Sequence, residues 1–184
     1  MPNDKYILFL DTESTGSDVN KDEMIEIGLV LLDADTLEEV DTFNAVITPS
    51  QKAFNRMMNN KVVHDMHAAN GLIDDLDNGF LAYDADLSID AWLNGHDIDT
   101  THLPYGGSGV LHFDRKFIDK YLPRLSKRIT YWAYDVGVVR RTAAKVGYPW
   151  LSQDAKNHRA LVDARFHADE FRYAVKAFGR MKSK

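Results

Sequence analysis

The sequence predicts an α/β domain built on a mixed sheet. Three apolar segments near the N-terminus, residues 6–12, 24–32 and 39–47, have the β-branched and aromatic composition of strands. From residue 51 onward, helical patterns alternate with one further strand. A run of strands followed by helices interleaved with strands is typical of an α/β domain with parallel and antiparallel neighbours in one sheet.

The size and composition of the chain are those of one soluble domain. Its 184 residues, 45% of them hydrophobic, suffice for one well-packed core, so we expect residues 1–184 to form a single domain. The chain has no cysteine, which excludes disulfides, thiolate zinc sites and cysteine nucleophiles. It shows neither a secretory signal nor an apolar run approaching the roughly 20 residues of a membrane-spanning helix. We therefore expect a soluble, cytoplasmic protein without a membrane partner.

The net charge of −6 bears on the class of partner. Domains that hold long nucleic acids through phosphate contacts are usually basic, so we expect any nucleic-acid partner to be short or held mainly at one end. An acidic total is also typical of carboxylates that gather to bind divalent cations, whose charge offsets theirs.

The N-terminal half is expected to begin with a meander and to continue in short helices. Asp and Thr turn signals separate the three apolar segments, which favours successive hairpin-connected strands. The pattern then becomes helical over residues 51–68, until an Asn-Gly pair interrupts it. Residues 72–76 and 86–95 predict further short helices, while the rest of the segment 77–106 is rich in Asp, Asn and Gly and predicts no regular element.

The C-terminal half is expected to alternate helices with a strand. Apolar residues recur every four positions from Phe113 to Leu125, the stripe of a helix lying on a sheet, and Pro123 ends or kinks that helix. Residues 128–136 predict a strand and residues 137–146 a helix. The final helix, over residues 159–179, carries these apolar residues on one face: Leu161, Ala164, Ala168, Phe171, Val175 and Phe178.

Two carboxylates close the first strand, in the stretch ILFLDTESTG. Residues two apart in a strand point to the same side, so Asp11 and Glu13 project together, on the side of Ile7 and Phe9. Adjacent carboxylates raise each other's pKa unless a cation lies between them, and Mg²⁺ and Mn²⁺ prefer such oxygen ligands. The alternative is a polar strand end that leads into a turn.

Three further residues are candidates to complete a metal site. Asp114 lies at the start of a predicted helix, and the late segment HRALVDARFHADEF contains His158 and Asp163. Residues five apart on a helix point about 140° apart, so His158 and Asp163 converge only if the histidine lies in a loop before the helix. Asn157 suits a helix boundary at that point. Taken alone, His158 is better explained as a surface imidazole at a helix start.

In chain order these residues resemble the DEDDh family of 3′–5′ exonucleases, and most closely its oligoribonuclease members. The matching motifs are Asp-x-Glu-x-Thr-Gly at residues 11–16, Asp114 in LHFDRKFIDKYLPRL, and His-x₄-Asp in HRALVDAR. The element HAANGL at residues 67–72 adds to the resemblance, which covers nearly the whole chain. It implies a ribonuclease H-like fold, a mixed five-stranded sheet flanked by helices, in a single DEDDh exonuclease domain over residues 1–184.

The same resemblance implies an activity and a cofactor. The activity is that of a metal-dependent 3′–5′ exoribonuclease, which degrades short single-stranded RNA oligonucleotides to nucleoside 5′-monophosphates. Two Mg²⁺ or Mn²⁺ ions would clamp the attacking and leaving oxygens. Asp11 would bridge both ions, and Asp114 would support one of them. Glu13 and Asp163 would complete the other, and His158 would take the proton from the nucleophilic water, work suited to an imidazole.

The resemblance further implies a substrate-binding set: Thr15, Gly16, His67, Asn70, Tyr131 and Trp132. Near this set the chain departs from the family. Where the family has a base-wedging leucine, this chain has Ser17, and where the family has a phosphate-binding arginine, it has Trp132. Asn70 replaces a serine of the family, and Gly109 replaces an asparagine. We expect Trp132 to stack on a base in place of the missing contacts, a contribution of roughly 1–3 kcal/mol. The remaining histidines are interpreted as surface or packing residues: His64, His96, His102, His112 and His167.

Other functions remain open. The same centre would serve a 3′–5′ exonuclease acting on single-stranded DNA, of the proofreading or trimming type. A non-catalytic binding module of the same fold is disfavoured, because all five catalytic positions are present. A homodimer is implied by the resemblance alone, and the choice between Mg²⁺ and Mn²⁺ is open because their ligand preferences overlap.

Overall fold

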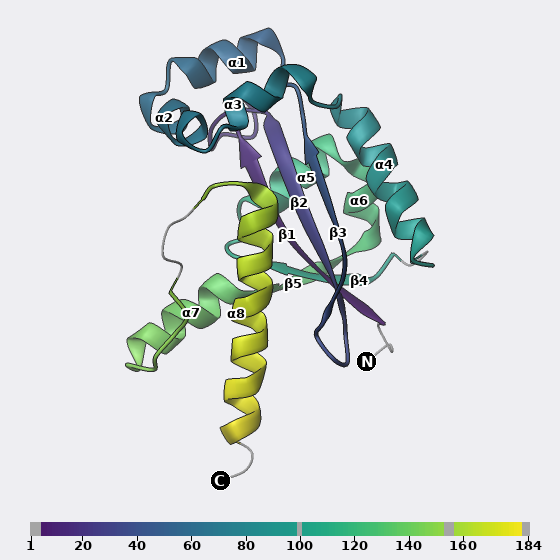
Figure 1. The fold of residues 1–184 in the computed structure, drawn as a ribbon, viewed down its shortest axis with the longest axis vertical. Coiled ribbons are helices and arrows are strands. Elements are labelled where there is room, and N and C mark those ends of the chain that lie inside the picture. The colour runs from purple at the N-terminus through teal and green to yellow at the C-terminus, as the bar shows by residue number, and fades with distance from the viewer. Residues whose placement is uncertain (1–4, 99–100, 153–156, 182–184) are drawn as a thin grey trace.

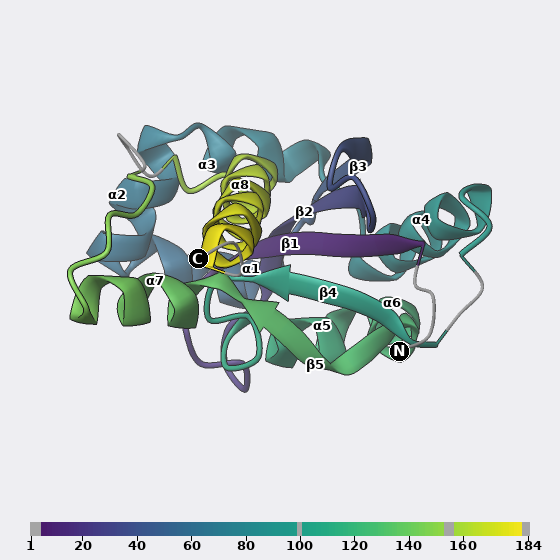
Figure 2. The same ribbon diagram turned by 90° about the horizontal axis from the view of Figure 1, so that it is seen from below.

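A five-stranded mixed sheet organises the computed structural model, which describes residues 5–98, 101–152 and 157–181. The strand order is β3-β2-β1-β4-β5, and helices cover both faces (Figures 1 and 2). The strands are β1 (Tyr6–Ser14), β2 (Met24–Asp33), β3 (Glu39–Val46), β4 (Leu103–Gly107) and β5 (Ile129–Asp135). β1, β2 and β3 pair antiparallel as the expected meander, while β4 and β5 run parallel to β1. The mixed five-stranded sheet is therefore confirmed.

The fourth strand is an element that the sequence pattern did not locate. β4 begins at the end of the segment 77–106 and has the sequence LPYGG, all of it buried. Two parallel partners, β1 and β5, flank it in the sheet. A strand this short, with Pro104 and two glycines, has no local periodicity to mark it, because its pairing comes from neighbours that are distant in sequence.

The helices begin and end close to the predicted boundaries. They are α1 (Gln51–Met58), α2 (Lys61–Ala69), α3 (Leu72–Asp75), α4 (Ala82–Gly95), α5 (Asp114–Tyr121), α6 (Pro123–Arg128), α7 (Val136–Lys145) and α8 (Ala160–Met181), with a 3₁₀ turn at Leu76–Asn78. α4 begins earlier than predicted, at Ala82. Pro123 separates two helices, as expected, and occupies the first turn of α6, where its missing N–H leaves no bond unmade. None of the helices in the described ranges combines the length and apolar character of a membrane span.

Side chains on β1 alternate between two apolar layers. Leu8 and Leu10 belong to the cluster that packs against α4, α5 and α6. Ile7 and Phe9 face the other way and pack with Ala164 of α8. Each such side chain, fully buried, contributes about 1.5–3 kcal/mol to folding. Because the alternation continues along the strand, its last residues on the Ile7 side lie beneath the start of α8.

The start of α8 lies directly against the sheet because β2 has a glycine there. Gly28 pairs in register with Asp11, and a Cβ on Gly28 would lie 2.2 Å from the backbone nitrogen of Leu161. The first helical N–H, that of Ala160, donates to Glu26 Oε2 at 2.9 Å. On β2, Gly28 thus leaves room for the helix and Glu26 caps its N-terminus, and together they fix the first turn of α8 beside Asp11.

The far end of α8 departs from the sheet (Figure 1). Val175 and Phe178 lie on the apolar face that the sequence pattern identified, yet both are exposed. Phe178 and Ala177 instead line an apolar groove with residues of α7. The one-sided pattern therefore corresponds to burial only over the turns that contact the sheet.

Candidate active site

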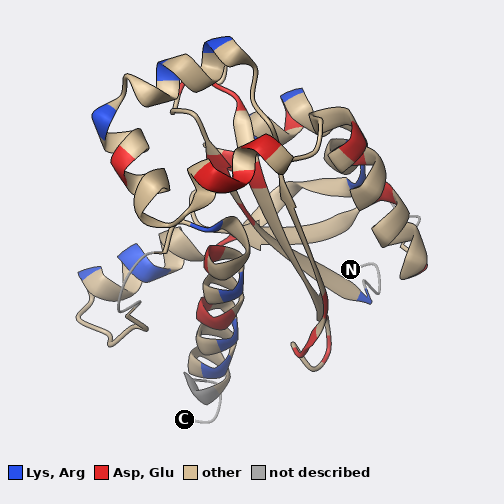
Figure 3. Ribbon diagram, turned by 45° about the horizontal axis from the view of Figure 1, so that its top comes forward, with Lys and Arg blue, Asp and Glu red and all other residues tan. Residues whose placement is uncertain are grey.

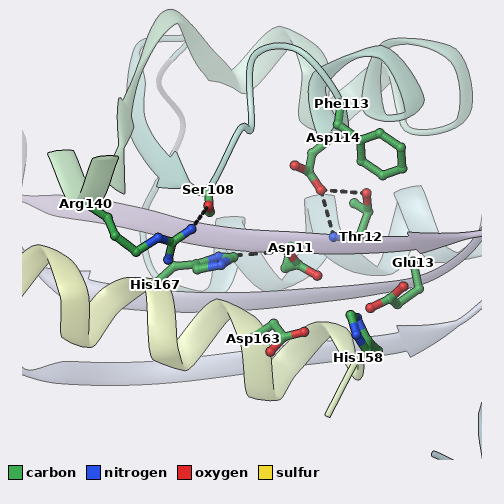
Figure 4. Close-up of a pocket in the computed structure, with 10 residues that line it drawn as sticks. All are labelled: Asp11, Thr12, Glu13, Ser108, Phe113, Asp114, Arg140, His158, Asp163 and His167. Atoms are coloured by element: carbon green, nitrogen blue, oxygen red, sulfur yellow. Dashed lines mark hydrogen bonds and ion pairs between the residues drawn. The ribbon is translucent and has the colours of Figure 1, made fainter. Parts of the chain in front are cut away.

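A cavity of about 210 Å³ opens at the C-terminal end of β1, where this strand meets α5 and α8 (Figure 4). Its lining residues are Asp11, Thr12, Glu13, Ser108, Phe113, Asp114, Arg140, His158, Asp163 and His167. The structure thus brings all five predicted catalytic residues to one pocket, although they come from three distant parts of the chain.

Asp11 and Glu13 project from β1 toward α8, as the strand alternation predicted (Figure 4). Burial raises the pKa of Asp11 well above its usual range, and the nearby charges of Asp114 and Glu13 raise it further. Burial is also the main cause that raises the pKa of Glu13 to about 9, followed by the charge of Asp163. Repulsion of this kind is relieved when a cation binds between the carboxylates.

Asp114 begins α5 and is anchored by β1. Its Oδ1 accepts hydrogen bonds from Thr12 N at 2.9 Å and from Thr12 Oγ1 at 2.7 Å. Burial raises the pKa of Asp114 to about 6, and the bonds from Thr12 limit that rise because they favour the charged form. Neighbouring β1 residues thus supply one pair of carboxylates and orient a third.

His158 and Asp163 have the arrangement that their spacing required. α8 begins only at Ala160, so His158 lies before the helix and Asp163 in its first turn. Glu13, His158 and Asp163 each place one ligand atom within 4.8 Å of the others. His158 has a φ of 49°, a left-handed conformation that costs a non-glycine residue about 1–2 kcal/mol. The surrounding structure must therefore hold this residue in place.

Residues around His158 supply that support. Asn70 donates through Nδ2 to the carbonyl oxygen of His158. The next residue, Arg159, pairs with Glu26 Oε1 at 3.0 Å and with Asp75 Oδ2 at 2.9 Å. The carboxamide oxygen of Asn70 accepts from Leu72 N at 3.0 Å, so both of its polar ends bond within the protein.

Three other predicted substrate-binding residues lie outside the pocket lining. Thr15 is buried, and its Oγ1 accepts from Glu23 N at 2.9 Å. Gly16 packs on a carboxylate, since a Cβ there would lie 2.5 Å from Asp22 Oδ2. His67 is fully buried with Nε2 3.2 Å from the carbonyl oxygen of Ser14, and this burial lowers its pKa. In this structure the three shape the turn after β1.

The predicted residues on β5 also lie outside the pocket lining. Tyr131 is 89% exposed at this edge of the sheet. Trp132 is half-buried and packs edge-on against Tyr134, with ring centroids 5.3 Å apart. Ser17 is exposed in the loop after β1.

The pocket also contains residues that the sequence reasoning missed. His167, interpreted there as a surface or packing residue, is buried and lines the pocket, with Nδ1 3.9 Å from Asp11 Oδ1. Its position four residues after Asp163 was the available signal, because residues one turn apart share a helix face.

Arg140 contributes the guanidinium group of the pocket, and no local signal marked it. Its Nη1 donates to both oxygens of the buried Glu170, at 2.7 and 2.9 Å. Its Nη2 donates to Ser108 Oγ at 2.9 Å (Figure 4). These bonds join α7, α8 and the end of β4, which are brought together only by the fold.

The donor set fits hard divalent cations. Four carboxylates face one small cavity, and oxygen ligands of this kind suit Mg²⁺ and Mn²⁺. The raised pKa of Glu13, caused first by burial and then by neighbouring carboxylates, shows that the charged cluster is unfavourable without a compensating charge. Asp11, Glu13, Asp114 and Asp163 are the residues that could hold the ions.

Comparisons with known proteins agree with this geometry. The RNase T exonuclease family model matches residues 8–85, which include Asp11 and Glu13. An oligoribonuclease of Tropheryma whipplei is 30% identical over 176 residues, which cover 94% of this chain and 92% of that protein.

Two solved structures share the fold. One is the nuclease domain of 3′hExo, a DEDDh family member bound to rAMP, with a TM-score of 0.59, 19% identity and coverage of 96% of this chain and 94% of that one. The other is Escherichia coli exonuclease I in complex with a dT13 oligonucleotide, with a TM-score of 0.68, 12% identity and coverage of 97% of this chain and 43% of that one.

Proposed function

Since the chain belongs to the oligoribonuclease family of exonucleases, we propose that its pocket hydrolyses short single-stranded RNA from the 3′ end. The products are nucleoside 5′-monophosphates. The observation that carries the proposal is the convergence of Asp11, Glu13, Asp114, His158 and Asp163 on one cavity. Residues 1–184 constitute one exonuclease domain in this proposal.

Each residue of the centre has a separate task. Asp11 lies between Asp114 on one side and Glu13 with Asp163 on the other, and these four carboxylates would hold the divalent ions (Figure 4). Bound divalent ions supply Lewis-acid stabilisation of the charge on the phosphoryl oxygens. His158 accepts the proton of the attacking water at an imidazole nitrogen. Mg²⁺ and Mn²⁺ both satisfy this donor set.

Groups from several elements of the fold hold the substrate next to the centre. Arg140 supplies the guanidinium group of the pocket and is placed to contact phosphate oxygens of the substrate. It would take the role of the family's strand arginine, whose position in this chain is occupied by Trp132. α8 carries acidic and basic residues along its length (Figure 3), which suits a short substrate held at the centre better than a long basic track. Thr15, Gly16 and His67 remain predicted substrate-binding residues.

Three further properties belong to the proposal. The exposed ring of Tyr131 at the sheet edge supports a homodimer in which that residue reaches the partner's substrate. Trp132 stacks on a base, and Trp132→Ala raises KM on short oligonucleotides without a large change in kcat. An unchanged KM would contradict the stacking role. A cytoplasmic location remains a prediction.

A product ladder tests the activity. The protein is incubated with Mg²⁺ or Mn²⁺ and 5′-labelled RNA from two to about twenty nucleotides, with DNA of matched sequence and Asp163→Ala as controls. Stepwise loss from the 3′ end, with dinucleotides consumed most readily, is the expected result. Accumulating dinucleotides would contradict the preference for very short RNA, and faster cleavage of DNA would support a DNA exonuclease instead.

A further inference from the structure

The residue that carries the proposed general base is tied to the turn between α2 and α3. Asn70 donates through Nδ2 to the carbonyl oxygen of His158, 88 positions away in the chain. Its Oδ1 accepts from Leu72 N at 3.0 Å, which fixes the carboxamide in an Asx turn. The side chain therefore connects a rigid local turn to one peptide group of the catalytic segment.

His158 is held from one side by this contact and from the other by β2. Ala160 N donates to Glu26 Oε2 at 2.9 Å, and Arg159 pairs with the same carboxylate. These contacts fix the chain after His158 but not the peptide of His158 itself. The bond from Asn70 acts on that peptide, at a residue whose φ of 49° is unfavourable for a side chain.

We propose that Asn70 is a positioning residue, which orients the His158 imidazole toward Glu13 and Asp163 by fixing the His158 peptide. Asn70 does not line the pocket, so it acts through His158 rather than on the substrate. The inference rests on the proposed function, because it assumes that His158 accepts a proton during hydrolysis. It replaces the direct substrate contact that sequence resemblance implied for this residue.

The chemistry of the carboxamide allows the two bonds to be separated. An amide offers a donor and an acceptor at once, whereas a carboxylate only accepts. Asn70→Asp retains the Asx turn to Leu72 N, since aspartate forms this turn as readily as asparagine. Asn70→Asp removes the N–H donor to the carbonyl oxygen of His158 and places a negatively charged carboxylate opposite that oxygen. Asn70→Ala removes both bonds without adding charge.

The experiment compares these variants by steady-state kinetics on a dinucleotide, thermal melting and calorimetric Mn²⁺ binding. Asn70→Asp is expected to lower kcat by roughly ten- to a hundredfold, with KM and Mn²⁺ affinity close to wild type and a lower melting temperature, because its carboxylate faces a carbonyl oxygen. Asn70→Ala should lower kcat to a similar extent and also lower the melting temperature. Asn60→Asp, the same change at an exposed residue before α2, is the matched control and should leave all four quantities unchanged.

A double-mutant cycle with His158→Ala identifies the route of the effect. If Asn70 acts through His158, Asn70→Asp causes no further loss of the residual turnover of His158→Ala. An equal loss in both backgrounds, a wild-type kcat for Asn70→Asp, or weakened Mn²⁺ binding would overturn the positioning role. A fully active His158→Ala variant would instead overturn the proposed function, so the two failures are distinguishable.

Discussion

The two walls of the pocket both carry candidate catalytic side chains but are held by different means. On one wall, β1 carries Asp11 and Glu13 and orients Asp114, and it is a central strand with partners on both sides. On the other wall, His158 and Asp163 lie at the start of α8, whose position depends on contacts with β2 and with the α2–α3 turn. The strand wall follows from local alternation, whereas the helix wall follows from long-range contacts. We therefore expect distant substitutions to disturb the helix wall first.

Removing a ligand from either wall tests whether both walls serve one site. Asp163→Ala and Asp11→Ala are each expected to lower kcat by about a thousandfold or more, and His158→Ala by roughly 10²–10⁴. Asp163→Ala and Asp11→Ala should remain folded, because a cluster of repelling carboxylates loses strain when one is removed. His158→Ala should remain folded because that side chain lies outside the buried core. Kinetics and circular dichroism melts provide the measurements. Wild-type turnover in Asp163→Ala or His158→Ala would contradict the assignment of these residues to the catalytic centre.

A methyl group on Gly28 tests how far the helix wall depends on close packing. Its Cβ would lie 2.2 Å from Leu161 N, which is backbone and cannot rotate away. Gly28→Ala should lower the free energy of unfolding by about 3 kcal/mol, at the upper end of overpacking effects, and displace Asp163. Gly95→Ala is the control, since a Cβ there meets nothing within 4 Å, and it should be neutral or slightly stabilising. Equal urea midpoints for the two variants would contradict the packing argument.

The pH dependence of the metal-free protein tests the strand wall. The folded protein raises the pKa of Glu13 from 4.5 to about 9, so it retains a proton that the unfolded chain releases. The resulting stability is complete below pH 4.5 and is lost as the pH rises toward 9. In the presence of a chelator, the free energy of unfolding should fall by on the order of 6 kcal/mol across this window, and added Mg²⁺ should restore it at the alkaline end. Glu13→Gln should remove most of the pH dependence of the free energy of unfolding. If the pH dependence persisted in that variant, it would arise from groups other than Glu13.

The smallest expected effect comes from the bond that supports Asp114. Thr12→Val removes the hydroxyl that donates to Asp114 Oδ1 at 2.7 Å and leaves the backbone bond in place. The pKa of Asp114 should rise further above 6, since a bond to the charged form is lost. The metal concentration for half-maximal activity should increase severalfold, equivalent to roughly 1 kcal/mol. Thr142→Val, on the exposed face of α7, should leave this metal concentration unchanged. Equal values for the two variants would contradict the role of the Thr12 hydroxyl in supporting Asp114.

Much of the fold was predictable where a pattern is local. The strands of the meander, the break at Pro123 and the start of α8 after His158 all follow from periodicity, turn signals and spacing. β4 was not predictable, because its five residues acquire strand geometry from β1 and β5 rather than from their own composition. The exposure of Phe178 was also missed, since an apolar stripe does not indicate where the sheet beneath it ends.

The candidate catalytic residues could be named from the sequence alone: two carboxylates on one face of a strand, and three more residues whose order and spacing resemble a known exonuclease family. Their surroundings could not be named, because they depend on how the fold packs. His167 and Arg140 enter the pocket, and Asn70 bonds His158 instead of lining the cavity. Strand alternation is a property of neighbouring residues, whereas these contacts join residues far apart in the chain, and such contacts exist only once the sheet and α8 have packed together.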